Sequence, residues 1–333
     1  MNRPAFHFRK VIQADLPHLV GLLPPALRFE ADTKQRLPVL WKQFVDAEAK
    51  SFCVVEDLER PYPDGLEGFG LSVFVTDSFA DEFCANPQPY FPEFFYKRAL
   101  GGEHIVLDSE QLRAANCTNG INIALLHFGL RNEDLSNLRT AEAVKVGSAA
   151  FYFFHMGYKV RLIINEVYGS GHRNYMAAGG LPLTRDYQSD APAQFAAVPP
   201  EHYPYLFALR DGQLPPGAVN PLSQLSQLFG APEPRLGFSR AERQLLERAL
   251  LNETDAQIAK VTGVSPDAVK KTWGNIYARV ERAAPFLMPD TIPSLGIRGQ
   301  EKRRHLLEYI RMHLEELRPG CPAPANRGRR PGR

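Results

Sequence analysis

Hydrophobic and polar positions alternate between strand-like and helix-like patterns over the first 187 residues. Runs rich in β-branched and aromatic residues predict strands at 6–12, 51–56, 68–76, 122–129 and 159–168. Apolar positions at helical spacing predict a helix capped by Asp15 and further helices at 33–48 and 140–158. This order predicts an α/β N-terminal domain, 1–187, in which helices cover a mixed sheet.

The pattern changes at residue 188, where prolines become frequent. Because proline lacks a backbone donor and breaks helices, residues 188–234 are predicted to be a connecting region with short ordered pieces. Its aromatic run, 203–207, is expected to pack on the first domain. The end of the chain, 319–333, consists mostly of Pro, Gly and Arg and is predicted to be a disordered basic tail.

Capping signals predict three consecutive helices in a C-terminal domain, 235–318. Ser239 with Glu242 and Thr254 with Gln257 have the spacing of capping boxes, in which each side chain bonds the other residue's amide. Gly263 is expected to end the second helix in the left-handed conformation. The sequence therefore predicts an all-α domain built around a helix-turn-helix.

The third helix of this domain, 265–281, begins with Ser265 as its cap. One face carries an apolar stripe of Val269, Trp273, Ile276, Tyr277 and Val280. Lys270, Lys271 and Gly274 fall on the opposite face. A short helix, a tight turn and a longer helix with lysines near its start form the arrangement that enters a DNA major groove.

Residues 238–280 resemble the LuxR-type (GerE-like) DNA-binding domain. The motifs that match are Phe-Ser-Arg-Ala-Glu at 238, Thr-Asp-Ala-Gln-Ile-Ala at 254, Gly-Val-Ser at 263, Val-Lys at 269 and Asn-Ile-Tyr-Ala-Arg-Val at 275. The resemblance implies that this helix lies in the major groove and that Thr254 contacts phosphate. The implied DNA-binding residues are Thr254, Ser265, Lys270, Lys271, Gly274 and Asn275.

The chain departs from this family after the third helix. Residues 284–298 are inserted before a predicted helix, 300–317, whose apolar stripe is expected to pack on the core of the C-terminal domain. A contact in a homodimer stays open as the alternative role of this stripe.

The order of elements in the N-terminal domain resembles the GNAT acyltransferase fold. The matching features are the strand at 123–128, the His-Met-Gly-Tyr ending of the next helix at 155 and the Arg-Asn-Tyr-Met-Ala-Ala-Gly-Gly-Leu stretch at 173. GNAT enzymes bind acetyl-CoA through a glycine-rich loop after the fourth strand. Here that loop, 129–137, lacks the glycine pattern and contains Glu133 and Asp134. This difference favours a degenerate sensor or scaffold over a catalyst.

Composition and charge agree with a regulator. Hydrophobic residues make up 44% and charged residues 23% of the 333 positions, which is typical of a globular protein. No apolar run has the length of a membrane helix, and no signal peptide is recognised, so a cytoplasmic protein without a membrane partner is expected. Residues 231–333 carry 19 Lys and Arg against 12 Asp and Glu, whereas residues 1–230 carry 20 against 25. A basic segment on an acidic body favours nucleic-acid binding.

No motif in the sequence predicts catalysis. There is no glycine-rich phosphate loop, no HExxH and no nucleophile elbow, and His127, His155 and His172 form no set. The four cysteines, at positions 53, 84, 117 and 321, lack metal-ligand spacing. We therefore expect no catalytic residue, no metal and no cofactor.

These observations predict a transcriptional regulator that is not an enzyme. Its partners would be double-stranded DNA, a small-molecule or protein signal at the N-terminal domain, and a second copy of the chain in a dimer. The alternative is an acyl-CoA-dependent N-acyltransferase whose helix-turn-helix directs it to DNA or to another partner.

Overall fold

The computed structural model describes residues 6–45, 47–48, 50–213, 224–230, 232–288 and 298–321. These residues form two compact units. Unit 1 comprises Met1–Leu112 and Gly120–Ala231, and unit 2 comprises Arg113–Asn119 and Pro232–Arg333. Most of the tail predicted to be disordered, from residue 322 onward, lies outside the described residues.

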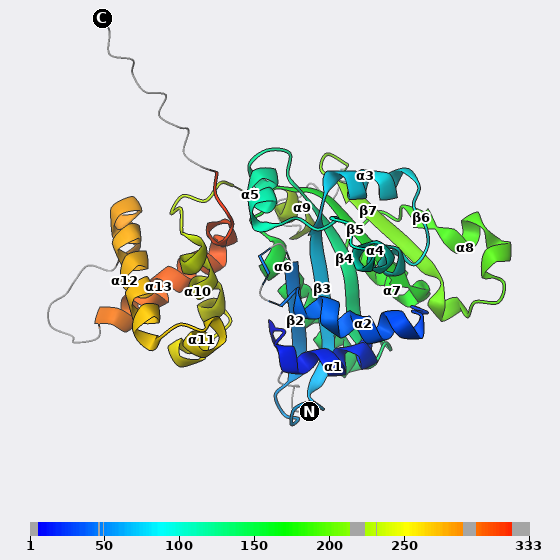
Figure 1. Cartoon of the computed structure of the whole chain (residues 1–333), viewed down its shortest axis with the longest axis horizontal. Helices are drawn as coiled ribbons and strands as arrows, with labels where there is room; N and C mark the ends of the chain where they lie inside the picture. Colours follow the sequence, from blue (N-terminus) through cyan, green and yellow to red (C-terminus); the bar gives the residue numbers. More distant parts are fainter. Residues whose placement is uncertain are drawn as a thin grey trace, which may run out of the picture. The chain divides into compact units, whose positions relative to one another are not determined.

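Unit 1 is built on a seven-stranded sheet in the order β1-β2-β3-β4-β5-β7-β6 (Figure 1). The strands are β1 (Phe6–Lys10), β2 (Lys50–Asp57), β3 (Leu66–Val75), β4 (Ile121–Leu130), β5 (Val160–Tyr168), β6 (Arg185–Asp186) and β7 (Pro204–Arg210). Among these strands β4 and β5 form the one parallel pair, and the other neighbours are antiparallel. The crossover that a parallel pair requires is α6 (Leu138–His155).

Helices cover both faces of this sheet. The main core lies on the face covered by α1 (Leu16–Leu19), α2 (Ala31–Lys42), α3 (Asp77–Ala85) and α4 (Phe91–Leu100). The other face packs against α6, where a smaller cluster joins the strand residues Val55 and Leu130 to Ala143 and Val144 of the helix. Unit 1 also contains α7 (Gly169–Ala178), α8 (Tyr187–Asp190) and α9 (Gln224–Phe229), and short 3-10 turns.

The expected α/β domain with a mixed sheet is confirmed. The predicted strands and the helix at 140–158 correspond to β1–β5 and α6, with ends that shift by a few residues. Sequence patterns missed α3, α4 and α5 (Ser109–Cys117). They also missed β7, which lies within the predicted connecting region and pairs with β5. The predicted aromatic run at 203–207 belongs to this strand.

The described part of unit 2 consists of helices and short 3-10 turns. Its helices are α10 (Arg240–Leu250), α11 (Asp255–Thr262), α12 (Pro266–Ala283) and α13 (Arg298–Met312). Both predicted capping boxes form, since the Ser239 side chain accepts from the Glu242 amide and the Thr254 side chain accepts from the Gln257 amide. Gly263 ends α11 with a φ of 70°, in the left-handed region.

The two faces of α12 lie as the pattern predicted. Val269, Trp273, Ile276 and Val280 are buried, and Lys270 is exposed on the other side. The Trp273 indole donates to Asp255 Oδ1 at 3.2 Å, and the Arg303 guanidinium lies 4.3 Å from its ring centroid. Trp273 therefore connects α12 to both α11 and α13.

The apolar stripe predicted at 300–317 is buried within unit 2. It spans α13 and the 3-10 turn η6 (Leu314–Leu317), with Leu306 and Ile310 fully buried. The carboxylate of Glu316 accepts from the amides of Arg235 and Leu236 at 3.1 and 2.9 Å, which ties this turn to the start of the unit. Packing inside the unit thus accounts for the stripe.

Replacing Trp273 with alanine is expected to destabilise unit 2 by about 3–5 kcal/mol, because a buried ring would leave a cavity. Hydrogen exchange of the α10–α12 amides in the full chain would report this loss. Gly274→Ala is the matched control on the next residue. A Cβ there meets no atom within 4 Å, and alanine in a helix interior is favoured by about 0.5–1 kcal/mol. Equal protection in the two variants would contradict the assigned core.

Candidate functional site

The parallel strands β4 and β5 separate near the middle of β4. Their last paired residues are Leu125 and Asn165. Beyond this point β4 continues beside β3 to Leu130, and β5 continues beside β7 to Tyr168. The facing edges of the two strands therefore present backbone N–H and C=O groups that are not used between them.

A β-bulge marks the same place on β4. His127 lies opposite Leu71 and Leu125 lies opposite Ser72, so Leu126 is an extra residue relative to β3. Leu126 belongs to the main core, and His127 contacts the aromatic side chains of the same core. The bulge thus directs two successive side chains to the face of the sheet covered by α2 and α4.

Glu166 is a buried acid on the corresponding part of β5. Its Oε1 accepts from the Phe91 amide and from the Tyr168 hydroxyl, both at 2.9 Å. Its Oε2 has no hydrogen-bond partner among the described residues. Glu166 continues the row of Leu162 and Ile164 on the core-facing side of β5, where an aliphatic residue would be ordinary.

The start of α4 is shaped around this carboxyl group. Tyr90, the N-cap residue, has φ 64° and ψ 51°, a left-handed conformation that costs a non-glycine residue about 1–2 kcal/mol. The amides of Tyr90 and Phe91 both stabilise the charged form of Glu166. A helix N-terminus suits a carboxylate because its free N–H groups and dipole favour negative charge. Backbone strain of this kind is concentrated at functional sites.

Burial dominates the ionisation of Glu166. It raises the pKa of the carboxyl group to about 8, against the lowering effects of the Tyr168 hydroxyl and the two amides. The carboxyl group therefore exchanges a proton near neutral pH, which is the range required of a general base or acid.

His127 is held on β4 by a chain of hydrogen bonds. Trp41 Nε1 donates to the Tyr96 hydroxyl at 2.9 Å, and this hydroxyl lies 2.8 Å from His127 Nε2. Because the hydroxyl already accepts from Trp41, its proton points to Nε2, and the His127 proton is assigned to Nδ1. Burial lowers the pKa of His127 to about 3, so the ring is neutral. Its Nδ1 has no partner among the described residues.

Both strand residues are thus held by the same helix. The first turn of α4 bonds Glu166 on β5, and Tyr96, further along the helix, bonds His127 on β4. Figure 1 shows α4 in front of these two strands. The helix therefore spans the place where the strands separate and fixes a carboxyl group and a neutral imidazole on the same face of the sheet.

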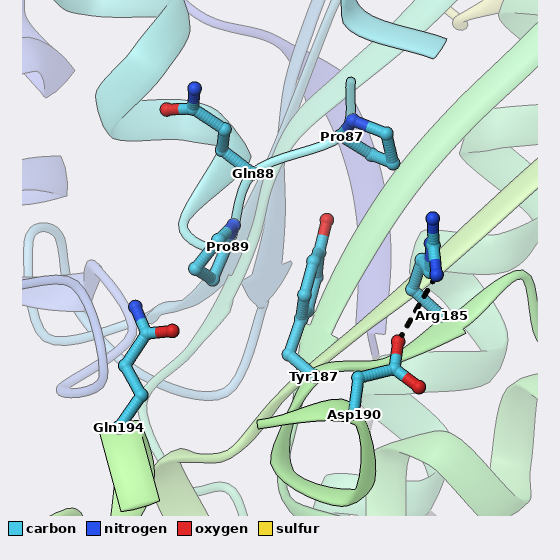
Figure 2. A pocket seen from close by; sticks show the side chains of 7 residues that line it. All are labelled: Pro87, Gln88, Pro89, Arg185, Tyr187, Asp190 and Gln194. Carbon is cyan, nitrogen blue, oxygen red and sulfur yellow. Dashed lines mark hydrogen bonds and ion pairs between the residues drawn. The ribbon is translucent and has the colours of Figure 1, made fainter. Parts of the chain in front are cut away.

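A pocket of about 470 Å³ adjoins this region (Figure 2). It is lined by residues from the loop between α3 and α4, from β6 and α8, and from the 3-10 turn η3 (Pro192–Phe195): Pro87, Gln88, Pro89, Arg185, Tyr187, Asp190 and Gln194. Its volume falls within the range of small-molecule sites. The Tyr187 side chain is only 7% exposed, and its hydroxyl has no hydrogen-bond partner among the described residues.

Tyr187 connects the pocket electrostatically to Glu166. Burial raises the pKa of the Tyr187 hydroxyl, and the negative charge of Glu166 raises it further. The charge of Glu166 acts in the same direction on the pKa of Tyr90 and Tyr168. The charge of Glu166 therefore acts on three tyrosine hydroxyls, of which Tyr168 bonds the carboxyl group and Tyr187, which lines the pocket, is unpaired among the described residues.

The loop before α6 does not offer the phosphate cradle of GNAT enzymes. The Asn137 side chain accepts from the amides of Arg139 and Thr140 at 2.9 and 3.4 Å, and Asp134 accepts from the Ser136 amide at 2.9 Å. The loop's own side chains therefore occupy the amides that would bind a diphosphate. The exposed Glu133 and Asp134 add negative charge.

The six residues expected to bind DNA all lie in unit 2. Thr254 and Ser265 cap the starts of α11 and α12, where their side chains bond backbone amides. The other four are exposed on α12: Lys270, Lys271, Gly274 and Asn275. None of the six belongs to the region around Glu166.

The sequence contained one signal for the missed site in unit 1. The run from Val160 to Tyr168 predicts a buried strand, and within it Glu166 shares a face with Leu162 and Ile164. A carboxyl group in such a row has to be hydrogen-bonded or protonated. Tyr187 gives no comparable local signal, because the pocket that it lines is formed by elements distant from one another in the chain.

Comparisons with known proteins found similarity to solved structures. No family model matches the chain, and no curated protein matches it. NAA60 from Arabidopsis thaliana in complex with acetyl-CoA is 15% identical with a TM-score of 0.34, and the match covers 62% of this chain and 99% of that one. FeeM, an N-acyl amino acid synthase from uncultured soil microbes, is 10% identical with a TM-score of 0.34, covering 63% and 93%. The spermidine/spermine N-acetyltransferase SpeG from Vibrio cholerae is 8% identical with a TM-score of 0.33, covering 63% and 95%.

These findings correct two expectations. The expectation that the chain is not an enzyme is wrong, because the structures found include an N-acetyltransferase and an N-acyl amino acid synthase. The expectation of double-stranded DNA as a partner is also wrong: the matched structures include one bound to acetyl-CoA, and none of those named above is a LuxR-type domain. At these identities and TM-scores, the function has to be argued from the site itself.

Two kinds of feature are absent from the described residues. None of their helices combines the length and the hydropathy needed to span a membrane. No group of three or more His, Cys, Asp or Glu side chains in this part of the chain is arranged to hold a metal ion.

The raised pKa of Glu166 predicts a pH-dependent stability. The folded state favours the protonated acid, so wild type loses stability as pH rises from the ordinary value of 4.5 through about 8. Glu166→Gln keeps an acceptor for the Phe91 amide and has no charge to bury. Across this interval the free energy of unfolding of Glu166→Gln should increase relative to that of wild type by at most about 1.4 kcal/mol per pH unit.

Denaturant melts of both proteins between pH 5 and pH 9 would measure this gain. Glu59→Gln is the control because Glu59 is an exposed loop residue. A stability difference between Glu166→Gln and wild type that stays constant with pH would contradict the buried, protonated state of Glu166.

Proposed function

We propose that unit 1 is an acyltransferase that moves an acyl group from a pantetheine-type thioester to an amine. The observation that carries this proposal is Glu166 beside the separation of β4 and β5. It is a buried carboxyl group with one unpaired oxygen and a pKa of about 8, next to two strand edges that no longer pair with each other.

The strand edges suit the donor. A pantetheine arm is an extended chain with two amide groups, and an extended chain of amides pairs with the free edge of a strand. Two parallel strands that separate can bond such a chain from both sides and orient its thioester end. The loop before α6 contributes little to a CoA diphosphate, because its amides are bonded to Asn137 and Asp134. Recognition would then rest on the pantetheine arm.

The reaction needs one proton acceptor. The amine nitrogen attacks the thioester carbonyl, a carbon–nitrogen bond forms, and the carbon–sulfur bond breaks. Glu166 Oε2 takes a proton from the nitrogen and returns it to the departing thiolate, so that an amide and a thiol leave the site. The neutral His127 offers an unpaired Nδ1–H on the neighbouring strand for the carbonyl oxygen.

Unit 2 is proposed to be a helix-turn-helix module that directs the enzyme to a partner. The capping boxes, the left-handed Gly263 and the buried face of α12 support this architecture. In this proposal Thr254 and Ser265 serve as helix caps, and the exposed face of α12 is available to the partner.

Thiol release tests the proposed reaction. Acetyl-CoA and S-acetyl-N-acetylcysteamine would be offered as donors, each with the amino acids and with a simple alkylamine as acceptors. Turnover is expected with both donors and should increase as pH rises through about 8, because the base has to be ionised. Glu166→Gln should lower kcat/KM by roughly 10²–10⁴-fold.

Glu93→Gln provides the matched control. Glu93 is a half-buried carboxyl group in the first turn of the same helix and accepts from the Arg28 amide. This variant should keep its activity within a few-fold of wild type. No thiol release from either donor with any amine, or equal losses in the two variants, would refute the proposed reaction.

A further inference from the structure

The pocket in Figure 2 carries one positive and one negative side chain. Arg185 Nη1 lies 3.4 Å from Asp190 Oδ2, and both side chains are 50% exposed. A long, half-exposed ion pair contributes little to stability. Its two members can therefore exchange partners with a charged ligand at low cost.

Arg185 has N–H donors that are not used within the described residues. Its one side-chain hydrogen bond within the described residues is the contact with Asp190. A guanidinium carries five N–H donors in a planar fork that matches a carboxylate. Arg185 can therefore bind a ligand carboxylate while Asp190 turns to a nearby ammonium group.

The remaining lining suits a small molecule without net charge. The rings of Pro87 and Pro89 provide an apolar wall, and the side-chain amides of Gln88 and Gln194 provide uncharged donors and acceptors. The charges in the lining balance. A phosphate would require more cations than Arg185, and a polyamine would require more carboxylates than Asp190.

The unpaired Tyr187 hydroxyl distinguishes one part of the pocket from the rest. It lines the pocket, is buried, and is coupled to the charge of Glu166. An amine held beside Tyr187 would therefore lie within the electrostatic reach of the proposed base.

We propose that this pocket binds the acceptor and that the acceptor is an α-amino acid. Arg185 bonds its carboxylate, and Asp190 with Tyr187 receives its amino group. The closely spaced opposite charges of the pocket match a carboxylate and an ammonium group that one carbon separates. This assignment rests on the proposed acyltransferase function for its reaction, whose product is then an N-acyl amino acid.

Binding in the absence of any acyl donor tests the pocket separately from catalysis. Isothermal titration of the full chain would compare glycine, L-leucine and L-glutamine with the amide of each, which keeps the amine and removes the carboxylate. At least one acid should bind, and about 10-fold or more tightly than its amide, because a charged hydrogen bond to Arg185 is lost. Arg185→Gln should abolish this preference.

Arg36→Gln is the matched control. Arg36 forms a comparable exposed pair with Asp32 at 3.6 Å, on α2, and this variant should keep the wild-type preference for the acid. Amides that bind as tightly as the acids, or no binding of any acid at about 10 mM, would overturn the assignment. The wild-type comparison alone decides the matter should Arg185→Gln fail to fold.

The two proposals fail in different ways. Amino acid binding without thiol release would support the assignment of the pocket and refute the acyltransferase function. Thiol release with alkylamines, combined with equal binding of the amino acids and their amides, would support the proposed reaction and refute this assignment of the pocket.

Discussion

The hydrogen bonds between the start of α4 and Glu166 are the contact on which the site depends. Without these bonds the carboxyl group would keep only the Tyr168 hydroxyl as a hydrogen-bond partner among the apolar side chains of the main core. Tyr90, whose backbone is in the left-handed conformation, directly precedes the donor Phe91. The same helix bonds His127 through Tyr96. One helix therefore sets the positions of the two polar groups on β4 and β5.

The parallel pair gives unit 1 its functional geometry. In an antiparallel meander each strand is paired along its length, whereas β4 and β5 stop pairing at Leu125 and Asn165 and then follow different neighbours. This divergence offers backbone groups to a donor, and the pocket at Tyr187 offers a separate space to an acceptor. The two substrates in our proposal therefore meet near Glu166 without competing for the same surface.

Local signals in the sequence predicted much of the fold. The capping box of Ser239 and Glu242 and the turn at Gly263 depend on a few neighbouring residues, and each formed as expected. β7 escaped prediction because nearby prolines dominate the local pattern, while the strand itself is stabilised by pairing with the distant β5. The site escaped prediction for the same reason. Glu166 gains its properties from burial in the core and from a hydrogen bond with Phe91, 75 positions away in the chain.

The bulge at Leu126 limits how the length of β4 can change over evolution. Along β4, His127 and Gly129 face one side of the sheet, while Phe128 and Leu130 face α6. A Cβ on Gly129 would lie 2.1 Å from the carbonyl oxygen of Leu22, and one on Gly147 of α6 would lie 2.3 Å from the Phe128 ring. A deletion elsewhere in the strand would exchange the faces on one side of the deletion. Losing one of the two bulge residues would leave the faces unchanged, because Leu126 and His127 face the same side of the sheet. β4 can therefore lose one residue and keep its alternation only at the bulge, with the loss of Leu126 from the core or of His127 and its hydrogen bond to Tyr96.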